Sequence, residues 1–401
     1  MKKVIYFTRT GLLEPLGQSQ VMNYMIGLSS KFSITIISNE KKEDLNNLQR
    51  VESLKYLCSQ NNIKWVQLKF RKRPLVLAQF FSIVDMFWAG IKEFFHGNVR
   101  LIHARSYIPA VSAWMIYRLC KVPFIFDMRG LWPEELIVSG RVNRGSFVHK
   151  CLKKIEVVLM RDSSAVVSLT DAGAAYLKAT NSSELINQKI EVIPTCADLD
   201  KFSPLSTKRS KEIVFGCIGS ILSGWFNILW FSKFLEVAHS LNKDTRFEII
   251  TRDNKSLVRE AVDPNNRLLR NLKITERSPE GMPEAIRGHH ISVMFYMGGE
   301  ISELGRSPTR LAEVLGCGLP VIVNDGVGDV ANIVKKYNVG VVVKSPALEH
   351  MESALKEISC LLQDNNLEMR CRKTAETIFS LESGTNKYRN LYCSIISKEK
   401  F

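Results

Sequence analysis

Short apolar runs alternate with amphipathic segments along the whole chain. In the first half, runs suited to buried parallel strands lie at residues 4–8, 33–38, 63–68, 101–104, 124–126, 165–168 and 191–193. Segments with helical spacing separate them, for example at residues 18–30, 45–60 and 109–120. The second half repeats this alternation, with strands predicted at residues 213–218, 247–251, 272–275, 291–295, 320–323 and 340–343. The pattern predicts two doubly wound α/β domains.

The boundary between the domains is expected within residues 194–211, a polar stretch with two prolines that ends in basic residues. We predict an N-terminal domain over residues 1–200 and a C-terminal domain over residues 205–382. With 401 residues the chain is long enough for two separate cores. The last predicted helices, at about 347–364, 367–379 and 383–396, have no strand after them.

Composition excludes several classes of protein. The hydrophobic fraction of 45% and the charged fraction of 24% are those of a soluble globular protein. No uninterrupted apolar stretch approaches the length of about 18 residues that a spanning helix needs. The nine cysteines form no CxxC motif or Cys/His cluster, which argues against zinc and against a disulfide framework. We therefore expect a reducing, cytoplasmic environment and no bound metal.

The net charge of +15 leaves several partners open. Most of the excess falls in residues 1–200, where it could serve anionic lipid or phosphorylated substrates, or reflect a generally basic surface. No nucleic-acid module and no aromatic ladder between basic residues is present, so nucleic acid is not an expected partner.

Residues 305–329, GRSPTRLAEVLGCGLPVIVNDGVGD, carry the most informative pattern in the chain. The residue types predict a helix with Ser307 as N-cap and Pro308 as its first residue, followed by an apolar strand. Arg306 and Arg310 flank the predicted helix start, where free backbone N–H groups attract anions.

Glu313 lies further along the same predicted helix. A carboxylate there can accept paired hydrogen bonds from a ribose diol. The alternative is an ordinary α/β unit in which the glutamate is merely solvated.

This segment resembles the donor-nucleotide segment of family-4 (group 1) glycosyltransferases of bacterial surface-polysaccharide type, which have the GT-B fold. In that family a Glu-x7-Glu pair usually spans the helix, and the second glutamate binds the nucleotide ribose. Glu313 matches the second glutamate, whereas Gly305 takes the place of the first. The resemblance implies that Arg306, Ser307, Thr309 and Arg310 bind the donor. It also implies that the last helix, about 383–401, packs back on the first domain.

Three further motifs lie in the first half, and the first and the last of them extend the resemblance. Gly17, in the turn RTGLLEPLGQSQ, matches the family's first loop and is therefore expected at the donor. His103 and Arg105 lie at the carboxyl end of a predicted strand, where binding residues are expected. His103 is either a site residue or a satisfied core histidine. The string FIFDMRGLWPEE resembles the family's central loop, in which Arg129 takes the place of a histidine that touches the donor sugar. Asp127 either orients Arg129 or acts on the acceptor hydroxyl; the alternative is a structural Asp–Arg pair.

Two cations expected from the resemblance are missing. The family's Arg and Lys that hold the donor diphosphate fall on Ser220 and Phe226. Either a single-phosphate donor such as a CMP-linked sugar is used, or Arg252, Arg306 and Arg310 replace them. The Asp198-Leu-Asp200 string is interpreted as a strand exit and not as a metal clamp, because family-4 enzymes are generally metal-independent.

The resemblance implies a retaining glycosyltransferase without a cofactor that moves a sugar from a nucleotide-sugar to a glycan, in many relatives a polyprenyl-linked one. A nucleotide-sugar epimerase and an inactive GT-B protein that binds a glycan or a partner are the alternatives. Residues 70–95 combine a basic start with a strongly apolar stretch. They fit either a helix on an anionic membrane surface, at the inner face of the cytoplasmic membrane, or a helix buried against the sheet.

Overall fold

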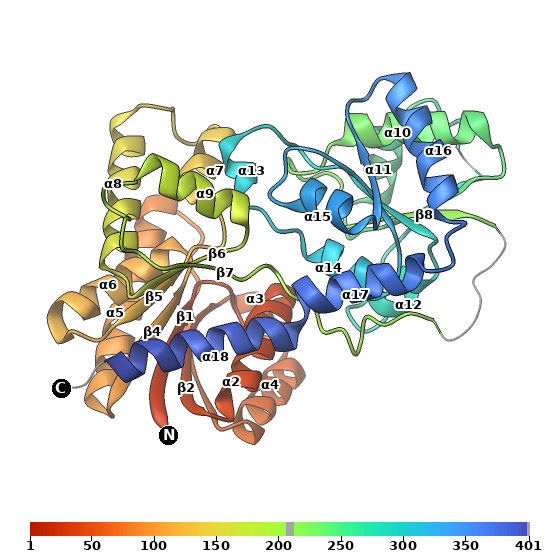
Figure 1. Cartoon of the computed structure of the whole chain (residues 1–401). Helices are drawn as coiled ribbons and strands as arrows, with labels where there is room; N and C mark the ends of the chain where they lie inside the picture. The colour runs from red at the N-terminus through yellow and green to blue at the C-terminus, as the bar shows by residue number, and fades with distance from the viewer. Residues whose placement is uncertain (206–211, 269, 399–401) are drawn as a thin grey trace. The chain divides into compact units, whose positions relative to one another are not determined.

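The computed structural model describes residues 1–205, 212–268 and 270–398 (Figure 1). It divides the chain into two compact units: Met1–Pro194 with Leu381–Phe401, and Thr195–Ser380. Part of the predicted boundary segment, residues 206–211, and the last three residues of the predicted final helix lie outside the described residues.

The first unit is built on a seven-stranded parallel sheet with the order β3-β2-β1-β4-β5-β6-β7. Its strands are β1 (Lys2–Thr8), β2 (Phe32–Glu40), β3 (Ile63–Lys69), β4 (Val99–Arg105), β5 (Phe124–Asp127), β6 (Ala165–Ser168) and β7 (Ile190–Val192). Each apolar run predicted in this half forms one of these strands. The inner strands β4, β5 and β6 are buried, and strands covered on both faces need nearly continuous apolar sequence.

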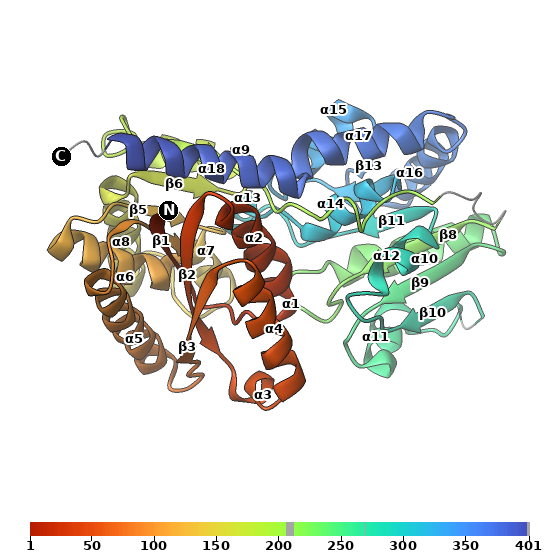
Figure 2. The same cartoon turned by 90° about the horizontal axis from the view of Figure 1, so that it is seen from below.

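Helices cover both faces of this sheet. They are α1 (Pro15–Gly17), the π-helical η1 (Gln18–Met22), α2 (Asn23–Ser29), α3 (Lys42–Leu45), α4 (Leu48–Gln60), α5 (Leu75–Phe95), α6 (Tyr107–Cys120), α7 (Trp132–Val138), α8 (Phe147–Asp162), α9 (Asp171–Thr180) and α18 (Leu381–Lys398). The prediction of one regular helix over residues 18–30 is wrong in detail: the chain is already helical at Pro15, and a π-helical segment interrupts the α-helix. Helix α18 lies against α2 and β4 of this unit (Figure 2).

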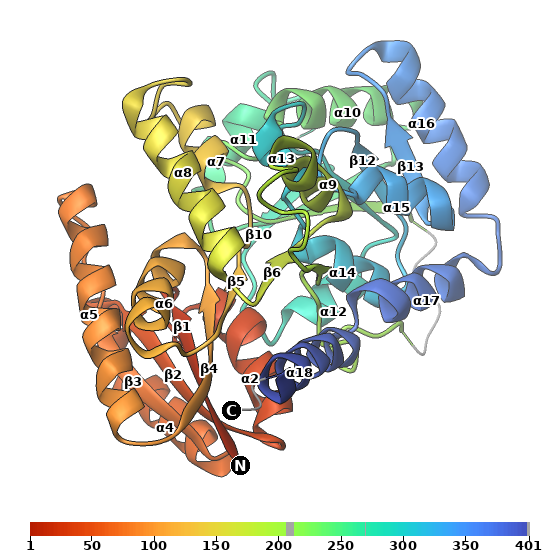
Figure 3. The same ribbon diagram turned by 60° about the vertical axis from the view of Figure 1, so that its left-hand side comes forward.

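Successive residues of β1 point to opposite faces of the sheet. Tyr6 contacts His103, whose ring contacts Tyr392 of α18. Phe7 faces the other way, where its ring lies next to Gly90 of α5. Helices α5, α6 and α8 follow one another on that second side (Figure 3).

The second unit repeats this arrangement with a six-stranded parallel sheet in the order β10-β9-β8-β11-β12-β13. Its strands are β8 (Val214–Ile218), β9 (Arg246–Ile250), β10 (Leu272–Thr275), β11 (Ile291–Met294), β12 (Val321–Asn324) and β13 (Gly340–Val343). Its helices are α10 (Ile228–Leu241), α11 (Lys255–Val262), α12 (Met282–Arg287), α13 (Ile301–Leu304), α14 (Thr309–Gly316), α15 (Val330–Tyr337), α16 (Leu348–Leu361) and α17 (Leu367–Phe379).

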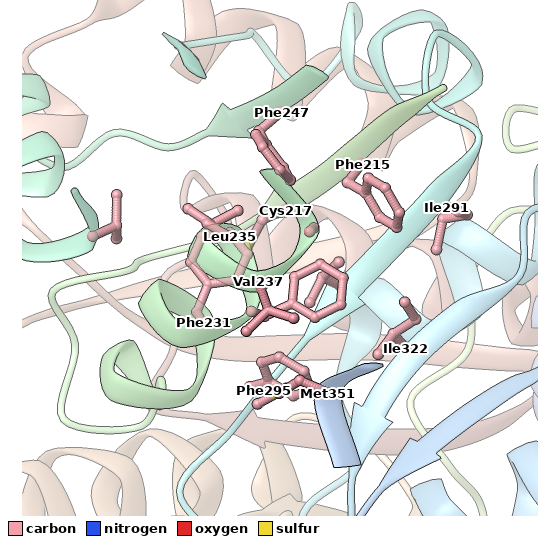
Figure 4. Close-up of a cluster of buried hydrophobic side chains, with 14 of the residues drawn as sticks. Phe215, Cys217, Phe231, Leu235, Val237, Phe247, Ile291, Phe295, Ile322 and Met351 are labelled. Carbon is pink, nitrogen blue, oxygen red and sulfur yellow. The ribbon is translucent and has the colours of Figure 1, made fainter. Parts of the chain in front are cut away.

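Aromatic side chains fill one face of the second sheet. Phe215 and Phe247 stack on neighbouring strands, and Phe231 and Phe234 from α10 pack in the same cluster, as does Phe295 (Figure 4). Full burial of one such side chain stabilises a fold by about 1.5–3 kcal/mol. The second unit therefore has a core of its own.

Each sheet has a point at which its strand order reverses. In the first unit this switch point lies between β1 and β4, and in the second between β8 and β11. Ligands of open parallel sheets bind beyond the carboxyl ends of the strands at such points. The loops that follow these four strands are therefore the first places to look for a site.

Candidate functional site

In the second unit, residues from three loops meet at the switch point. Trp225 lies in the loop after β8, and the Arg306 guanidinium carbon lies 3.9 Å from the centroid of its indole ring. Phe226 forms an antiparallel bridge with Tyr296, which follows β11. The amide of Asn324, at the end of β12, donates to the Tyr296 carbonyl oxygen at 2.8 Å and accepts from the Tyr296 N–H at 2.8 Å. These contacts connect the carboxyl ends of β8, β11 and β12.

The start of helix α14 differs from the prediction. Ser307 is not its cap, because the Ser307 hydroxyl oxygen accepts the backbone N–H of Thr195 at 3.2 Å. The helix begins at Thr309, one residue later than predicted, with Pro308 at the N-cap position and no side-chain cap. Without a side-chain cap, the first-turn N–H groups can serve an anion.

Both arginines of this segment pair with a glutamate one helical turn away. Arg310 contacts Glu313, and Arg306 contacts Glu303 of α13. Both carboxylates are buried. Burial raises the pKa of Glu313, while the charge and hydrogen bond of Arg310 oppose that rise. The two cations and the predicted ribose ligand thus lie together, next to a second carboxylate.

Glu303 was not among the predicted site residues. It lies two residues before Gly305, the position at which the family motif has its first glutamate. Its place next to Arg306 shows that a carboxylate is present in this region although the motif position is empty. A glutamate two residues before the expected motif position was the signal in the sequence that could have identified Glu303.

Other predicted cations are placed differently. Arg252 extends from the end of β9 with its side chain 57% exposed, 3.8 Å from Glu276. Within the described part of the chain, no hydrogen bond or ion pair connects Arg252 with α14. Phe226, at the position of the family's lysine, is a core residue that packs on Phe231 and Tyr296. Asp198 caps a local turn by accepting the N–H of Asp200 at 3.2 Å.

In the first unit, Gly17 is required by close packing. A Cβ atom on Gly17 would lie 2.0 Å from the carbonyl oxygen of Gly11 and 2.8 Å from Cα of Leu12. The turn after β1 therefore lies directly on the helical segment that follows it. This contact explains a glycine at position 17 independently of any ligand.

His103 lies inside the first unit and is 1% exposed. Its Nδ1 is 2.6 Å from the Tyr392 hydroxyl, and its Nε2 is 3.3 Å from Oδ2 of Asp127. Burial lowers the pKa of His103, with the Asp127 carboxylate acting in the opposite direction. In the neutral ring that results, Nε2–H donates to Asp127 and Nδ1 accepts from Tyr392. The structure therefore places His103 as a buried partner of Asp127.

Asp127 and Arg129 lie at the carboxyl end of β5. Asp127 Oδ2 also accepts the Tyr388 hydroxyl at 3.1 Å and lies 3.8 Å from Nη1 of Arg129. Burial works to raise the pKa of Asp127, but Arg129 and His103 lower it below its usual value. Arg129 has a left-handed backbone, with φ of 62°. Such strain costs about 1–3 kcal/mol and is concentrated at functional sites.

Arg105 joins this cluster from β4. It lies opposite Asp127 in the sheet register and is 7% exposed. Its Nη1 donates to the Thr10 hydroxyl oxygen at 3.4 Å. The structure thus brings His103, Arg105, Asp127 and Arg129 together and adds Tyr388 and Tyr392. Nothing in the sequence links the two tyrosines to this loop.

Comparison with known proteins identifies the fold. No family model matches the chain, and no curated protein matches it in sequence. Sucrose-phosphate synthase from Thermosynechococcus elongatus matches with a TM-score of 0.73 at 12% identity, over 100% of both chains. Anabaena HepE in complex with UDP and glucose matches with a TM-score of 0.69 at 13% identity, over 98% of this chain and 100% of HepE.

An epimerase-like protein matches as well. A Listeria monocytogenes protein assigned as a UDP-N-acetylglucosamine 2-epimerase has a TM-score of 0.63 at 12% identity, over 100% of this chain and 98% of its own. At such low identity these matches establish architecture. The prediction of the fold class is confirmed: two parallel α/β sheets with flanking helices give this chain the GT-B fold of glycosyltransferase structures.

Proposed function

We propose that this chain is a retaining, metal-independent glycosyltransferase that moves a sugar from a nucleotide-sugar to a glycan hydroxyl in surface-polysaccharide biosynthesis. The observation that carries the proposal is the cluster at the start of α14. There Arg306, Arg310 and Glu313 lie beside a helix start without a side-chain cap at the switch point of the second sheet. This unit would bind the donor, and the first unit the acceptor.

The arrangement favours a nucleoside-diphosphate donor over a CMP-linked one. Arg306 lies on the indole of Trp225, next to Phe226, where the family has a lysine. Arg306 and Arg310 would therefore hold the diphosphate in place of the missing pair, and Glu313 would accept hydrogen bonds from the ribose. HepE, which shares the fold, is known in complex with UDP-glucose. We propose UDP as the nucleotide.

Retention fits this site without an enzymic nucleophile. Stabilisation of the leaving phosphate by two guanidinium groups and a helix start, together with a positioned acceptor, supplies what a front-face displacement needs. The leaving phosphate takes the acceptor proton. Asp127 and Arg129 would lie on the acceptor side, with His103 holding the Asp127 carboxylate in place.

A lipid-linked acceptor agrees with the surface of α5. Five large apolar side chains of this helix are exposed and share one face by their spacing: Leu77, Phe80, Phe81, Trp88 and Phe95. Arg71 packs on the ring of Phe81, and exposed Lys72 and Arg73 follow it. Apolar rings flanked by cations suit an anionic membrane surface. No helix in the described residues is long and apolar enough to cross a membrane.

The first test is nucleotide binding by calorimetry and thermal shift. UDP, GDP, ADP, CDP and CMP are compared on wild type, Glu313→Gln and the control Glu236→Gln, which alters an exposed glutamate of the same unit. We expect UDP to bind best and Glu313→Gln to weaken it by about tenfold or more, since a charged hydrogen bond contributes about 1.5–3 kcal/mol. Preference for CMP would exclude the diphosphate donor.

The reaction is tested separately. With a UDP-sugar and a glycan acceptor, NMR of the product should show that the anomeric configuration of the donor is retained. The epimerase alternative has support from the epimerase-like fold neighbour. Isomerisation of UDP-N-acetylglucosamine without any acceptor would favour it, and UDP binding without turnover of any kind would favour an inactive binding protein.

A further inference from the structure

The cluster at the carboxyl ends of β4 and β5 has a surplus of positive charge. Two guanidinium groups, those of Arg105 and Arg129, are buried there with one carboxylate, that of Asp127. The side chain of Arg129 is 10% exposed. Burial of charge without a partner is costly, so a buried surplus cation calls for an explanation.

Hydrogen bonding within the cluster is incomplete as well. Nε of Arg105 and Nε of Arg129 are buried and have no hydrogen-bond partner among the described residues, and neither has Oδ1 of Asp127. Oδ2 of Asp127 already accepts from His103 and Tyr388. One oxygen of the carboxylate is thus committed to neutral donors, while each of the two guanidinium groups keeps an unused Nε–H group.

The position of the cluster points to a ligand. Arg105 ends β4 at the switch point of the first sheet, and Arg129 follows the neighbouring strand. The residue after Arg105, Ser106, also has a left-handed backbone with φ of 76°. Guanidinium forks are the side chains best suited to bidentate binding of phosphate and carboxylate.

We propose that Arg105 and Arg129 form a subsite for an oxyanion, a phosphate or carboxylate group carried by the acceptor. The inference rests on the proposed function for the identity of the acceptor, but the subsite itself can be tested without turnover. An anion held there would neutralise the surplus charge and accept hydrogen bonds from the unused Nε–H groups. The acceptor is then an acidic saccharide or one that carries phosphate.

The test measures binding of inorganic pyrophosphate and of D-glucuronate to the full chain by calorimetry at constant ionic strength, with D-glucose as the neutral control. UDP is present in excess, so that the donor site is filled. Arg105→Gln removes the fork, Arg105→Lys keeps the charge, and Arg118→Gln is the matched control at an exposed arginine of the same unit. Pyrophosphate as the better ligand indicates a phosphorylated acceptor, and glucuronate an acidic sugar.

We expect Arg105→Gln to weaken oxyanion binding at least tenfold, Arg105→Lys to lie between it and wild type, and Arg118→Gln to bind like wild type. The ligand-free Arg105→Gln variant should melt no lower than wild type, because it loses a surplus charge. UDP affinity should not change in any of the three. Oxyanion binding is also measured without UDP. A failure of UDP to bind would therefore contradict the proposed donor site and leave the test of the oxyanion subsite in place.

Four results would overturn the subsite. The first is a wild-type chain that binds neither anion, and the second is an Arg105→Gln variant that binds an anion as wild type does. An Arg105→Gln chain that unfolds or melts well below wild type would show that Arg105 is structural. Loss of UDP binding in Arg105→Gln would assign the guanidinium to the donor instead.

Discussion

The absence of a side chain at Gly216 makes room for a buried histidine in the second unit. A Cβ atom there would lie 1.9 Å from Nδ1 of His289, which is fully buried. We therefore expect Gly216→Ala to lower the free energy of unfolding by about 1–3 kcal/mol, as overpacking does. Gly224→Ala, at a position with no atom within 4 Å of its Cβ, is the control for chemical denaturation. Equal stability of the two variants would contradict this account.

The same histidine lowers the pKa of a neighbouring carboxylate. Nε2 of His289 lies 3.4 Å from Oε2 of Glu248, and this contact lowers the pKa of Glu248 to about 2. Since the folded-state pKa is below the unfolded one, the stabilisation is present above about pH 4.5 and is lost as the pH falls toward 2. It is on the order of 1–3 kcal/mol after solvent screening.

Glu248→Gln should therefore melt below wild type at pH 6, and the difference should shrink at pH 3. Thermal unfolding across this range checks the prediction, with Glu236→Gln as the control. A difference in melting temperature that grows as the pH falls would contradict the prediction.

At the scale of elements, helix α18 contacts the cluster around His103 and Asp127 through two tyrosines. Tyr388→Phe removes the hydroxyl that donates to Asp127 and leaves that buried carboxylate short of a donor. We expect a loss of about 1–2 kcal/mol and a melting temperature about 2–8 °C lower. Tyr56→Phe, at an exposed position of α4, should have no effect. An unchanged melting temperature for Tyr388→Phe would show that this hydrogen bond does not stabilise the unit.

Helix α5 is the second element with a testable role. The double variant Phe80→Ser, Trp88→Ser should reduce sedimentation with anionic vesicles about tenfold or more, because each buried ring contributes about 1.5–3 kcal/mol. Tyr56→Ser is the exposed control. Binding to neutral vesicles should be weak, and salt should weaken binding to anionic ones. Equal binding of the double variant would exclude α5 as the membrane contact.

At the scale of the whole molecule, two separate cores predict two unfolding transitions. UDP at about 100 times its Kd should stabilise only the unit that contains Glu313, by about 2.7 kcal/mol. Scanning calorimetry should then show one transition that moves with UDP and one that does not, and Glu313→Gln should abolish the shift. A single transition that moves as a whole would contradict independent unfolding.

Much of this architecture is determined by local sequence. Every strand of both sheets was predicted from its apolar run. The signal is clearest for central strands such as β5 and β12, because a strand buried on both faces leaves few positions for polar residues. Arg306, Arg310 and Glu313 could be predicted to lie near each other because they fall within eight residues, around one helix start. Single positions were less predictable: Ser307 bonds Thr195 and does not cap its helix, since a remote backbone N–H competes for its hydroxyl.

Tertiary structure alone decided which distant residues share a site. The order β1-β4-β5 and the return of α18 bring Tyr388 to Asp127 across 261 positions of sequence. In the second unit, the loop after β8 brings Trp225 under Arg306. Apolar periodicity encodes burial, which is a local property of each segment. Which polar groups contact each other depends on the strand order and on which helix covers which face of the sheet. Neither can be inferred from the spacing of residues along the chain.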